Sequence, residues 1–552
     1  MSQLSLKGWL RSGSPWIWLN AAAVAMSLIA VIGLLGIIAV YGLGYFWPGQ
    51  VASFEYKENG HTTQVIGEIH EREEVAISRL IEAGYALTDD GGNANRFLIR
   101  KGNRQQGADF GWVIEPYMSA VTYPENAAVV ERYEWGNAYG FISGIKREGK
   151  AVPSTDLQED LKPLLEKAEH LKAKIDAIEK DSLHSINYQL ERLRLQERKW
   201  LLSKALTAER QEALASERSD LNAQMSGFDQ TLSELRGRQG LDVLVLKLSS
   251  GQEIDVPLSV VVRVYYPNQL GVLGKFGFYF TKVWEFLSED PREANTEGGI
   301  FPAIFGTVMM VILMSIFVTP FGVIAAVYLR EYSKQGPLTR VIRIAVNNLA
   351  GVPSIVYGVF GLGFFVYFLG GSIDSLFFPE SYPSPVFGTP GILWASLTLA
   401  ILTVPVVIVA TEEGLSRVPI SVREGSLALG ATKAETLWNV ILPMSSPAMM
   451  TGLILAVARA AGEVAPLMLV GVVKLAPTLP LDGDLPFLHL DRKFMHLGFH
   501  IYDVGFQSPN VEAARPLVFA TAFLLVLVIV ILNLASITIR NNLREKYRSI
   551  GS

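Results

Sequence analysis

Arg459 and Glu463 are the only charged residues in an apolar run from residue 447 to residue 473. Placing a charge in hydrocarbon costs about 2.5 to 3.5 kcal/mol on the mildest insertion scale, so this pair must face a protein interior or an aqueous cavity. Four residues apart, the two side chains share one face of a helix. The guanidinium is always protonated and presents a planar fork of donors that matches oxyanions. Two roles are open: a salt bridge that locks helix packing, or a site in the path of an anionic solute.

A second informative feature is a charged helix-Gly-helix segment that lies between two apolar runs. Glu424 is followed six residues later by Gly430, which predicts the end of a short helix. Thr432 and Glu435 have the spacing of a capping box, so a second helix is expected to begin there. Pro443 is expected to end that second helix. The segment is typical either of a docking surface for a partner or of an amphipathic hairpin without one.

The composition places the chain in a membrane. Half of the 552 residues are hydrophobic and 18% are charged, which is too apolar for an ordinary soluble enzyme. Six apolar runs are long enough to cross about 30 Å of hydrocarbon. We expect the first to remain as an anchor, because it is too long for a signal-peptide core. The six predicted spans are residues 17–46, 300–329, 341–369, 391–410, 448–473 and 517–539.

Basic residues near the span ends predict the orientation, because Lys and Arg resist translocation. They precede the first span and follow the second and the last, whereas residues 370–390 contain none. We therefore expect both termini and the loop 412–446 in the cytoplasm and residues 48–298 outside. The loop 474–516, with four basic residues, departs from the rule. The residues that set the orientation are Lys7, Arg11, Arg330, Lys334, Arg340, Arg343, Arg540, Arg544, Lys546 and Arg548.

The region expected outside, residues 48–270, has two patterns. Residues 51–152 and 241–267 contain short apolar runs separated by polar turns, which predicts a β-rich shell, and the runs on either side of SSGQEID predict a hairpin. Residues 156–238 are poor in Gly and Pro and carry heptads, which predicts a coiled-coil helical hairpin with its turn near residues 203–207. Self-association within the hairpin and a docking or dimerising arm are both open. The heptad residues are Leu157, Leu164, Leu171 and Ile178, with Leu161, Ala168 and Ile175 offset by four.

Two further segments suggest membrane roles. Residues 271–299 begin with an aromatic amphipathic stretch, which predicts an interfacial elbow helix, with either a gating or a simple anchoring role. The third span contains Pro353 and several glycines, which are typical either of close helix packing or of a broken helix that lines a cavity. These glycines are Gly351, Gly358, Gly361 and Gly363.

Several chemistries are excluded by the sequence. The chain has no cysteine, which removes disulfides and thiolate chemistry. It has no G-x-x-x-x-G-K-[ST] phosphate loop, so it lacks the cradle that a P-loop ATPase needs. We therefore expect a protein that is not an enzyme and holds no cofactor, so any ATP-driven work must come from a separate subunit.

The motifs EGGIFPAIFGT, NNLAGVPSIVYGVFGL, EGSLALGATKAETLWNVILP, ARAAGEVAPL and HIYDVGFQSPNVEAARPL resemble the PstA permeases of bacterial phosphate-specific ABC importers. The charged segment is similar to the EAA loop, through which importer permeases contact their ATPase, although Gly425 and Ser426 stand in place of two alanines. The run from Arg459 to Pro466 resembles R-x-x-G-E-T-A-P, with Val464 in place of Thr. The resemblance covers about residue 289 onward and implies nothing for residues 51–270.

The resemblance implies a mainly α membrane protein with six transmembrane helices of the type I importer permease kind, 300–540 being the permease core and 541–552 a cytoplasmic tail. It implies import of inorganic phosphate through the bacterial inner membrane, with Arg459 and Glu463 in the substrate path. The implied partners are a PstC-like permease, two copies of a PstB-like ATPase and the periplasmic binding protein PstS. The coupling residues would be Glu424, Gly430, Thr432, Glu435 and Pro443. A permease for another oxyanion and a membrane sensor in phosphate signalling remain as alternatives.

Overall fold

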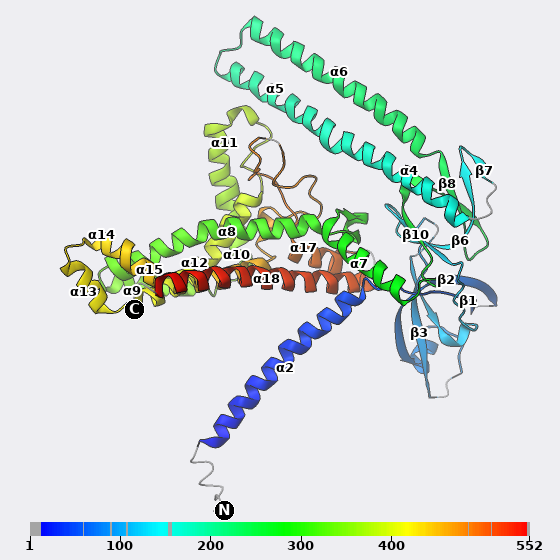
Figure 1. Ribbon diagram of the computed structural model, residues 1–552, viewed down its shortest axis with the longest axis horizontal. Helices are drawn as coiled ribbons and strands as arrows, with labels where there is room; N and C mark the ends of the chain where they lie inside the picture. The colour runs from blue at the N-terminus through cyan, green and yellow to red at the C-terminus, as the bar shows by residue number, and fades with distance from the viewer. Residues whose placement is uncertain are drawn as a thin grey trace, which may run out of the picture.

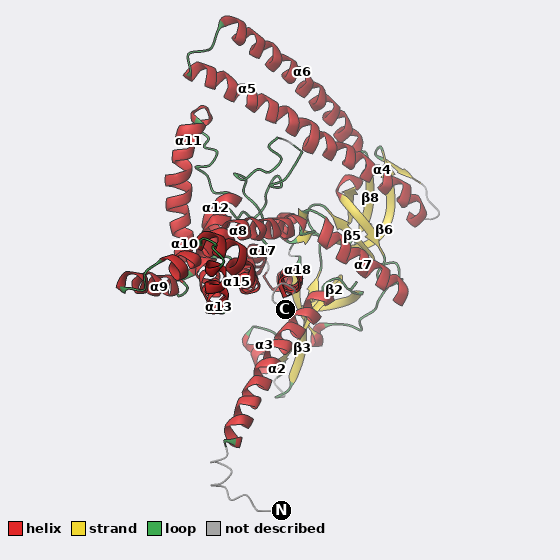
Figure 2. Ribbon diagram, turned by 60° about the vertical axis from the view of Figure 1, so that its left-hand side comes forward, coloured by secondary structure: helices red, strands yellow, loops and turns green. Residues whose placement is uncertain are grey.

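The computed structural model describes residues 13–548 apart from residues 59, 89–90, 106, 108, 153–156, 484 and 509–510. Lys7, Arg11 and the end of the predicted cytoplasmic tail, residues 549–552, lie outside the described residues. Figure 1 shows three parts: a helical bundle, a β region at one end of it, and a long helical hairpin that extends from the β region. Figure 2 shows that the long strands gather in the β region.

Six helices in the described part of the chain are long and apolar enough to cross a membrane, which confirms the predicted number. Three of these spans contain a π-helical segment, and each such segment is counted as part of its span. The spans are formed by α2 (Ser14–Gly44), α8 (Phe301–Val327) with η5 (Tyr328–Tyr332), α10 (Ser354–Phe360) with η6 (Gly361–Gly370) and α11 (Gly371–Phe377), α12 (Ile392–Ser416), α14 (Lys433–Thr436) with η8 (Leu437–Ile441) and α15 (Leu442–Gly462), and α18 (Val511–Arg548).

The prediction was wrong about the third span. Residues 341–349 belong to a separate amphipathic helix, α9 (Pro337–Leu349), and the span begins only at Ser354. Pro353 provides the physical reason, because a proline cannot donate the hydrogen bond of a helix interior and here caps α10 instead. The helix then continues to Phe377, eight residues beyond the predicted end of the span.

The prediction was also wrong about Pro443, which does not end the second helix of the charged segment. The helix runs from Lys433 through η8 and α15 to Gly462 as one span. A π-helical turn over Leu437–Ile441 immediately precedes Pro443, and such a turn changes the local hydrogen-bond pattern so that the missing N–H is tolerated. The fifth span therefore begins 15 residues before the predicted position and ends at Gly462 rather than at residue 473.

The bundle is built around α12, which is the most buried of the six spans and packs against α8 and α15. Trp394 of α12, at 1% exposure, lies in the core. By contrast, α2 is exposed along its length and contacts α18 near Gly42, where an added Cβ would lie 2.8 Å from the Phe519 carbonyl oxygen. The exposed apolar surface of α2 is suited to lipid or to another membrane subunit.

The β region contains two antiparallel sheets. The predicted hairpin is present as β8 (Asp242–Lys247) and β9 (Glu253–Pro257), but β9 ends at its proline. The next apolar residues form β10 (Val261–Tyr265), which pairs with β5 (Ala128–Arg132). A proline has no N–H for a ladder, which ends the strand there. The first sheet has β1 (Val51–Glu58), β2 (His61–Ala76), β3 (Asn93–Arg100) and β4 (Phe110–Ile114) in that order; the second has the order β10 (Val261–Tyr265), β5 (Ala128–Arg132), β6 (Ala138–Arg147), β8 (Asp242–Lys247), β9 (Glu253–Pro257), with β7 (Lys150–Val152) beside β6.

The helical hairpin, which we call the arm, consists of a helix formed by α4 (Leu157–Ala177), η2 (Ile178–Leu183) and α5 (His184–Leu202), packed against α6 (Ala208–Gln239). Its turn spans residues 203–207, as the sequence predicts. The Thr207 hydroxyl accepts from the Arg210 N–H at 3.3 Å and caps α6.

The heptad pattern of the arm is only partly reflected in its packing. Leu161 packs against the second sheet rather than α6. The π-helical turn of η2 then shifts the register, because the next buried residue after Ile175 is Ile186, eleven residues later. Beyond this turn, a seven-residue spacing returns in the cluster of Ile186, Leu193, Leu214 and Leu221.

We predict that Gly306→Ala destabilises the bundle. A Cβ at this position would lie 2.1 Å from the Met495 carbonyl oxygen, so the backbone must shift, which typically costs about 1 to 3 kcal/mol. Gly363→Ala is the control, because a Cβ there meets no atom within 4 Å. Thermal unfolding of the purified protein in detergent should show a lower midpoint for Gly306→Ala only, and equal midpoints would contradict the packing described.

Candidate functional site

Arg459 and Glu463 lie together within the bundle. The Arg459 Nε is 3.6 Å from the Glu463 Oε1, with side-chain exposures of 33% and 20%. This distance exceeds that of an ordinary hydrogen bond. Within the described part of the chain, this 3.6 Å contact is the closest approach of the guanidinium to a carboxylate. The arrangement can therefore offer hydrogen-bond donors to a ligand without first breaking a tight ion pair.

The helix ends between the two charges, which the sequence did not predict. α15 ends at Gly462, and Glu463 has an extended backbone with ψ of 135°. The chain then turns at Pro466 into the short α16 (Leu467–Val470). The two charges therefore do not share a continuous helical face, and the pair lies at a helix break. Breaks within membrane helices occur where protein or cavity water satisfies the freed backbone groups.

The third span packs against this break through its small residues. A Cβ at Gly358 would lie 2.7 Å from the Pro466 Cα, and one at Gly361 would lie 2.2 Å from the Thr398 Oγ1. These two glycines therefore allow close packing, which was one of the two predicted roles. Gly363, by contrast, has open space where a Cβ would be. The described residues contain no group of three or more His, Asp or Glu that could hold a metal ion.

The charged segment forms a compact turn at the opposite end of the bundle from the β region (Figure 1). α13 (Ile420–Ala428) ends before Gly430, whose φ is +91°. Thr432 then begins α14 with a complete capping box: its hydroxyl accepts from the Glu435 N–H, and the Glu435 carboxylate accepts from the Thr432 N–H at 2.7 Å. The predicted helix-Gly-helix geometry is present. Glu424 is exposed on α13.

Sequence reasoning missed the contacts that attach this segment to the second span. Arg423 forms an ion pair with Glu331 of η5, and the Lys433 ammonium donates to the Glu331 carbonyl oxygen. Lys433 also lies over the Tyr332 ring at 4.7 Å. The only sequence signal was the presence of charges at the span end, because Glu331 lies 92 residues before Arg423.

The same segment exposes large apolar side chains. Leu429 is 91% exposed and Trp438 is 71% exposed. Ile420 of the same segment is 70% exposed. Exposed apolar side chains of this kind are suited to contact with a partner or with lipid.

Comparison with known proteins gives the family. The model of the binding-protein-dependent transport system inner membrane component matches residues 318–548, which include the charged segment and both site residues. The chain is 33% identical to the phosphate transport system permease protein PstA of Mycobacterium leprae over 225 residues, which is 40% of this chain and 68% of that protein. It is 30% identical to the probable ABC transporter permease YqgH of Bacillus subtilis over 257 residues, covering 46% and 76%. The phosphate transport system permease protein PstC of Mesorhizobium japonicum is 29% identical over 262 residues, covering 46% and 76%.

The chain belongs to the family of inner-membrane permease components of binding-protein-dependent ABC transporters. The permease is a multi-pass membrane protein and is not itself catalytic. The β region and the arm precede the matched residues, so this likeness does not describe them.

In the permease, ion pairs attach the β region to the start of the second span. The connection from α7 (Val272–Ser288) to α8 contains a short hairpin, residues 289–298, formed by β11 (Pro291–Arg292), η4 (Glu293–Asn295) and β12 (Glu297–Gly298). Arg100 binds Glu297 at 2.5 Å, and Arg104 binds Glu293 at 3.1 Å. We call residues 289–298 the junction hairpin.

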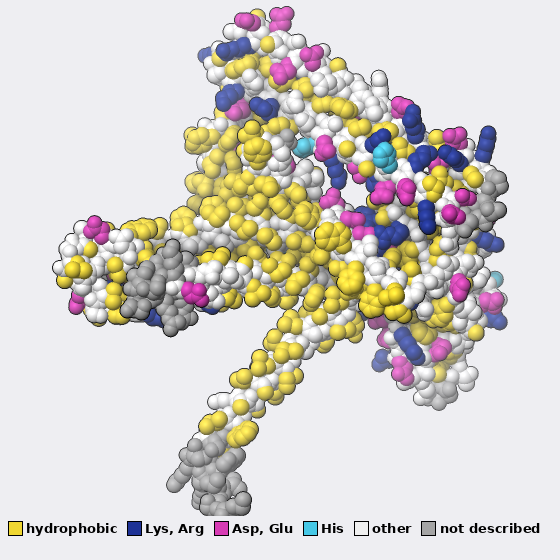
Figure 3. All heavy atoms as spheres, viewed as in Figure 1, with side chains coloured by type: hydrophobic (Ala, Val, Ile, Leu, Met, Phe, Trp, Pro, Cys, Tyr) yellow, Lys and Arg dark blue, Asp and Glu magenta, His cyan; other side chains and the backbone are white. Residues whose placement is uncertain are grey.

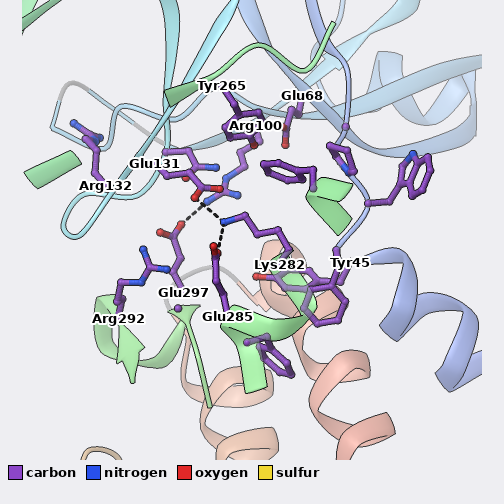
Figure 4. Close-up of a pocket in the computed structure, with 18 residues that line it drawn as sticks. Tyr45, Glu68, Arg100, Glu131, Arg132, Tyr265, Lys282, Glu285, Arg292 and Glu297 are labelled. Carbon is purple, nitrogen blue, oxygen red and sulfur yellow. Dashed lines mark hydrogen bonds and ion pairs between the residues drawn. The ribbon is translucent and has the colours of Figure 1, made fainter. Parts of the chain in front are cut away.

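Figure 4 shows the charged cavity beside this junction hairpin. The cavity has a volume of about 140 Å³. The Lys282 ammonium of α7 binds Glu131 at 2.6 Å and Glu285 at 3.1 Å, while Arg263 also binds Glu285. The acidic run SEDPREANTEGG before the second span was a sequence signal for such a cluster, but its basic partners come from distant strands.

Two carboxyl groups of this cavity have opposite pKa shifts. Desolvation raises the pKa of Glu68, and the nearby Arg100 only partly offsets it. Desolvation acts on Glu285 in the same direction, but Lys282 and Arg263 outweigh it and lower the pKa of Glu285. The ionised Glu285 thus stabilises the folded state, whereas ionisation of Glu68 opposes folding.

We predict opposite pH dependences for two isosteric substitutions. Because the folded-state pKa of Glu285 is lowered, its stabilisation is present above its unfolded pKa and lost as the pH falls, so Glu285→Gln should lower the unfolding midpoint at pH 7 but not at low pH. Because the pKa of Glu68 is raised, its ionisation costs stability as the pH rises, so Glu68→Gln should raise the midpoint at pH 7. Thermal unfolding from about pH 3, below the ordinary pKa of a glutamate, to pH 8 checks both, and shifts of the same sign at pH 7 would contradict the description.

Proposed function

We propose that this permease is the PstA-type transmembrane subunit of an ATP-driven importer of inorganic phosphate. The observation that carries the proposal is an arginine held at a helix break inside the membrane bundle, 3.6 Å from the carboxylate of Glu463. Its fork of donors matches phosphate oxygens. The likeness to two proteins named as phosphate transport system permeases supports phosphate as the ion.

The proposed mechanism is alternating access. ATP binding closes two copies of a partner ATPase, which act on the exposed surface of the segment from Ile420 to Trp438. Arg423 and Lys433 carry the motion to Glu331 at the end of the second span. A path beside Arg459 then opens toward the periplasm and accepts phosphate from a binding protein. Arg459 exchanges the Glu463 carboxylate for phosphate oxygens as the ion passes.

This role fits a heterodimer with a PstC-like permease in the bacterial inner membrane. Both termini and the α13–α14 segment would be cytoplasmic, and residues 48–270 would form a periplasmic region. α7 exposes Leu273, Phe276, Phe280 and Trp284 at helical spacing, which suits an interfacial elbow on the outer surface.

We predict that Arg459→Gln abolishes phosphate uptake and leaves assembly intact. The amide removes the charge that an anion requires, whereas Arg459→Lys keeps the charge but loses the planar fork, so it should retain a small fraction of uptake. Labelled-phosphate uptake by the reconstituted complex measures both variants, with co-purification of the ATPase as the check on assembly. Normal uptake by Arg459→Gln would contradict the proposal and would mean that Arg459 and Glu463 form a salt bridge that only stabilises helix packing.

We predict that Gly430→Ala uncouples ATP hydrolysis from transport. The φ of +91° at Gly430 is strained for any residue with a Cβ, so the turn between α13 and α14 should be displaced. Gly425→Ala is the matched control, because Gly425 is helical and a Cβ there meets no atom within 4 Å. Phosphate transported per ATP hydrolysed should fall several-fold for Gly430→Ala only, and equal ratios would refute the coupling role.

The alternatives are separated by substrate competition. If the importer carries another oxyanion, excess sulfate or molybdate should displace labelled phosphate from the assembled system. If the protein is a sensor in phosphate signalling, the assembled system should change the phosphate response of the cell without taking up phosphate itself.

A further inference from the structure

The arm runs from the β region along the side of the bundle and lies against loops that lead to the ends of the spans away from the α13–α14 segment. Figures 1 and 2 both show α5 passing beside α11 and the neighbouring loops. The Tyr188 hydroxyl donates to the Leu485 carbonyl oxygen at 2.5 Å, and α5 also contacts η7 (Pro379–Ser381). At the base of the arm, Lys180 binds Asp290 of the junction hairpin at 3.0 Å. Three contacts thus hold the arm against the bundle and the junction hairpin.

Basic residues continue the face of α5 that touches the bundle. Arg192 and Lys199 follow Tyr188 by four and eleven residues, which places all three within about 40° on one side of a helix. Both basic side chains are exposed, and neither has a carboxylate partner among the described residues. From residue 191 to residue 210 the arm has six basic and three acidic residues, a net charge of +3.

The loops beside the arm expose apolar side chains outside the candidate spans. Tyr382 is 72% exposed, Leu485 is 70% exposed and Phe487 is 53% exposed. The space-filling view in Figure 3 shows the arm, with its many charged side chains, above the predominantly apolar surface of the bundle. Apolar side chains next to a basic helix face form a surface suited to a protein partner with an apolar centre and an acidic rim.

These loops connect directly to the candidate site. The loop that carries Tyr382 leads into α12 at Gly391, and the loop that carries Leu485 and Phe487 follows the helix break after Glu463. The two meet where a Cβ on Gly471 would lie 2.7 Å from the Gly391 carbonyl oxygen. A protein that delivers a solute to Arg459 from this end must therefore contact the loops, and with them the arm.

We propose that the arm and these two loops form the docking surface for the solute-binding protein of this transporter. The family assignment supplies the class of partner, because its members are components of binding-protein-dependent systems. Arg192 and Lys199 attract the acidic rim of that protein, and Tyr382, Leu485 and Phe487 cover its apolar centre. The inference rests on the proposed orientation, with the arm outside, and is independent of which ion is carried.

The test measures the affinity of the co-purified binding protein for the assembled transporter in lipid nanodiscs. The double variant Arg192→Glu with Lys199→Glu should weaken binding about tenfold or more, and its affinity should depend less on salt than that of the natural protein. The control variant, Lys162→Glu with Lys174→Glu, makes the same change of charge at exposed positions near the base of the arm. It should bind the protein as tightly as the natural transporter.

A parallel measurement follows the binding of the same variants to vesicles of anionic lipid. Three outcomes would overturn the proposal: equal affinities of both variants for the binding protein, tighter binding by the Arg192 and Lys199 variant, or a loss of vesicle binding without a loss of affinity for the binding protein. Tighter binding would make the arm a cover over the loops, and loss of vesicle binding alone would make it a membrane contact. The phosphate assignment fails separately, because a transporter that carries another solute would still show the difference between the two variants.

Discussion

A guanidinium held inside an apolar bundle is the constraint on which this structure depends. Arg459 cannot lose its proton and is costly to place in hydrocarbon, so the chain must surround it with polar groups. The helix break after Gly462 provides them by placing the Glu463 carboxylate beside it and freeing backbone groups. The glycines of the third span then close around the break, and α12 completes the packing. A loose ion pair in such a setting suits a site whose occupant changes.

The two ends of the bundle are built differently. At one end, a capping box and a glycine of positive φ fix a short, exposed turn, and Glu331 connects that turn to the second span. At the other end, the start of the same span is held by the junction hairpin, whose carboxylates bind arginines of the β region. Ion pairs and hydrogen bonds therefore hold the second span at both of its ends. The arm adds a further contact to the junction hairpin through Lys180.

Local chemistry was predictable from the sequence, and long-range pairing was not. The capping box of Thr432 and Glu435, the glycine turn and the number of spans follow from short patterns that act within a few residues. The errors at the third span and at Pro443 came from treating hydropathy as a continuous property, whereas proline and π-helical turns set the boundaries. Arg423 with Glu331 and Arg100 with Glu297 join residues 92 and 197 positions apart, so no local pattern could indicate them. The helix break at Glu463 was also missed, because periodicity alone does not show where a buried helix ends.

The central claim, that the space beside Arg459 is the path of the transported ion, can be tested by chemical labelling. The chain has no cysteine, so a single Gly462→Cys reporter has no background within it. Gly462 is exposed, and a Cβ there meets no atom within 4 Å. In the assembled transporter, a small charged thiol reagent should label this position, and phosphate delivered by the binding protein should slow the labelling. A position that stays unlabelled in every nucleotide state, or labelling that phosphate does not change, would contradict the claim.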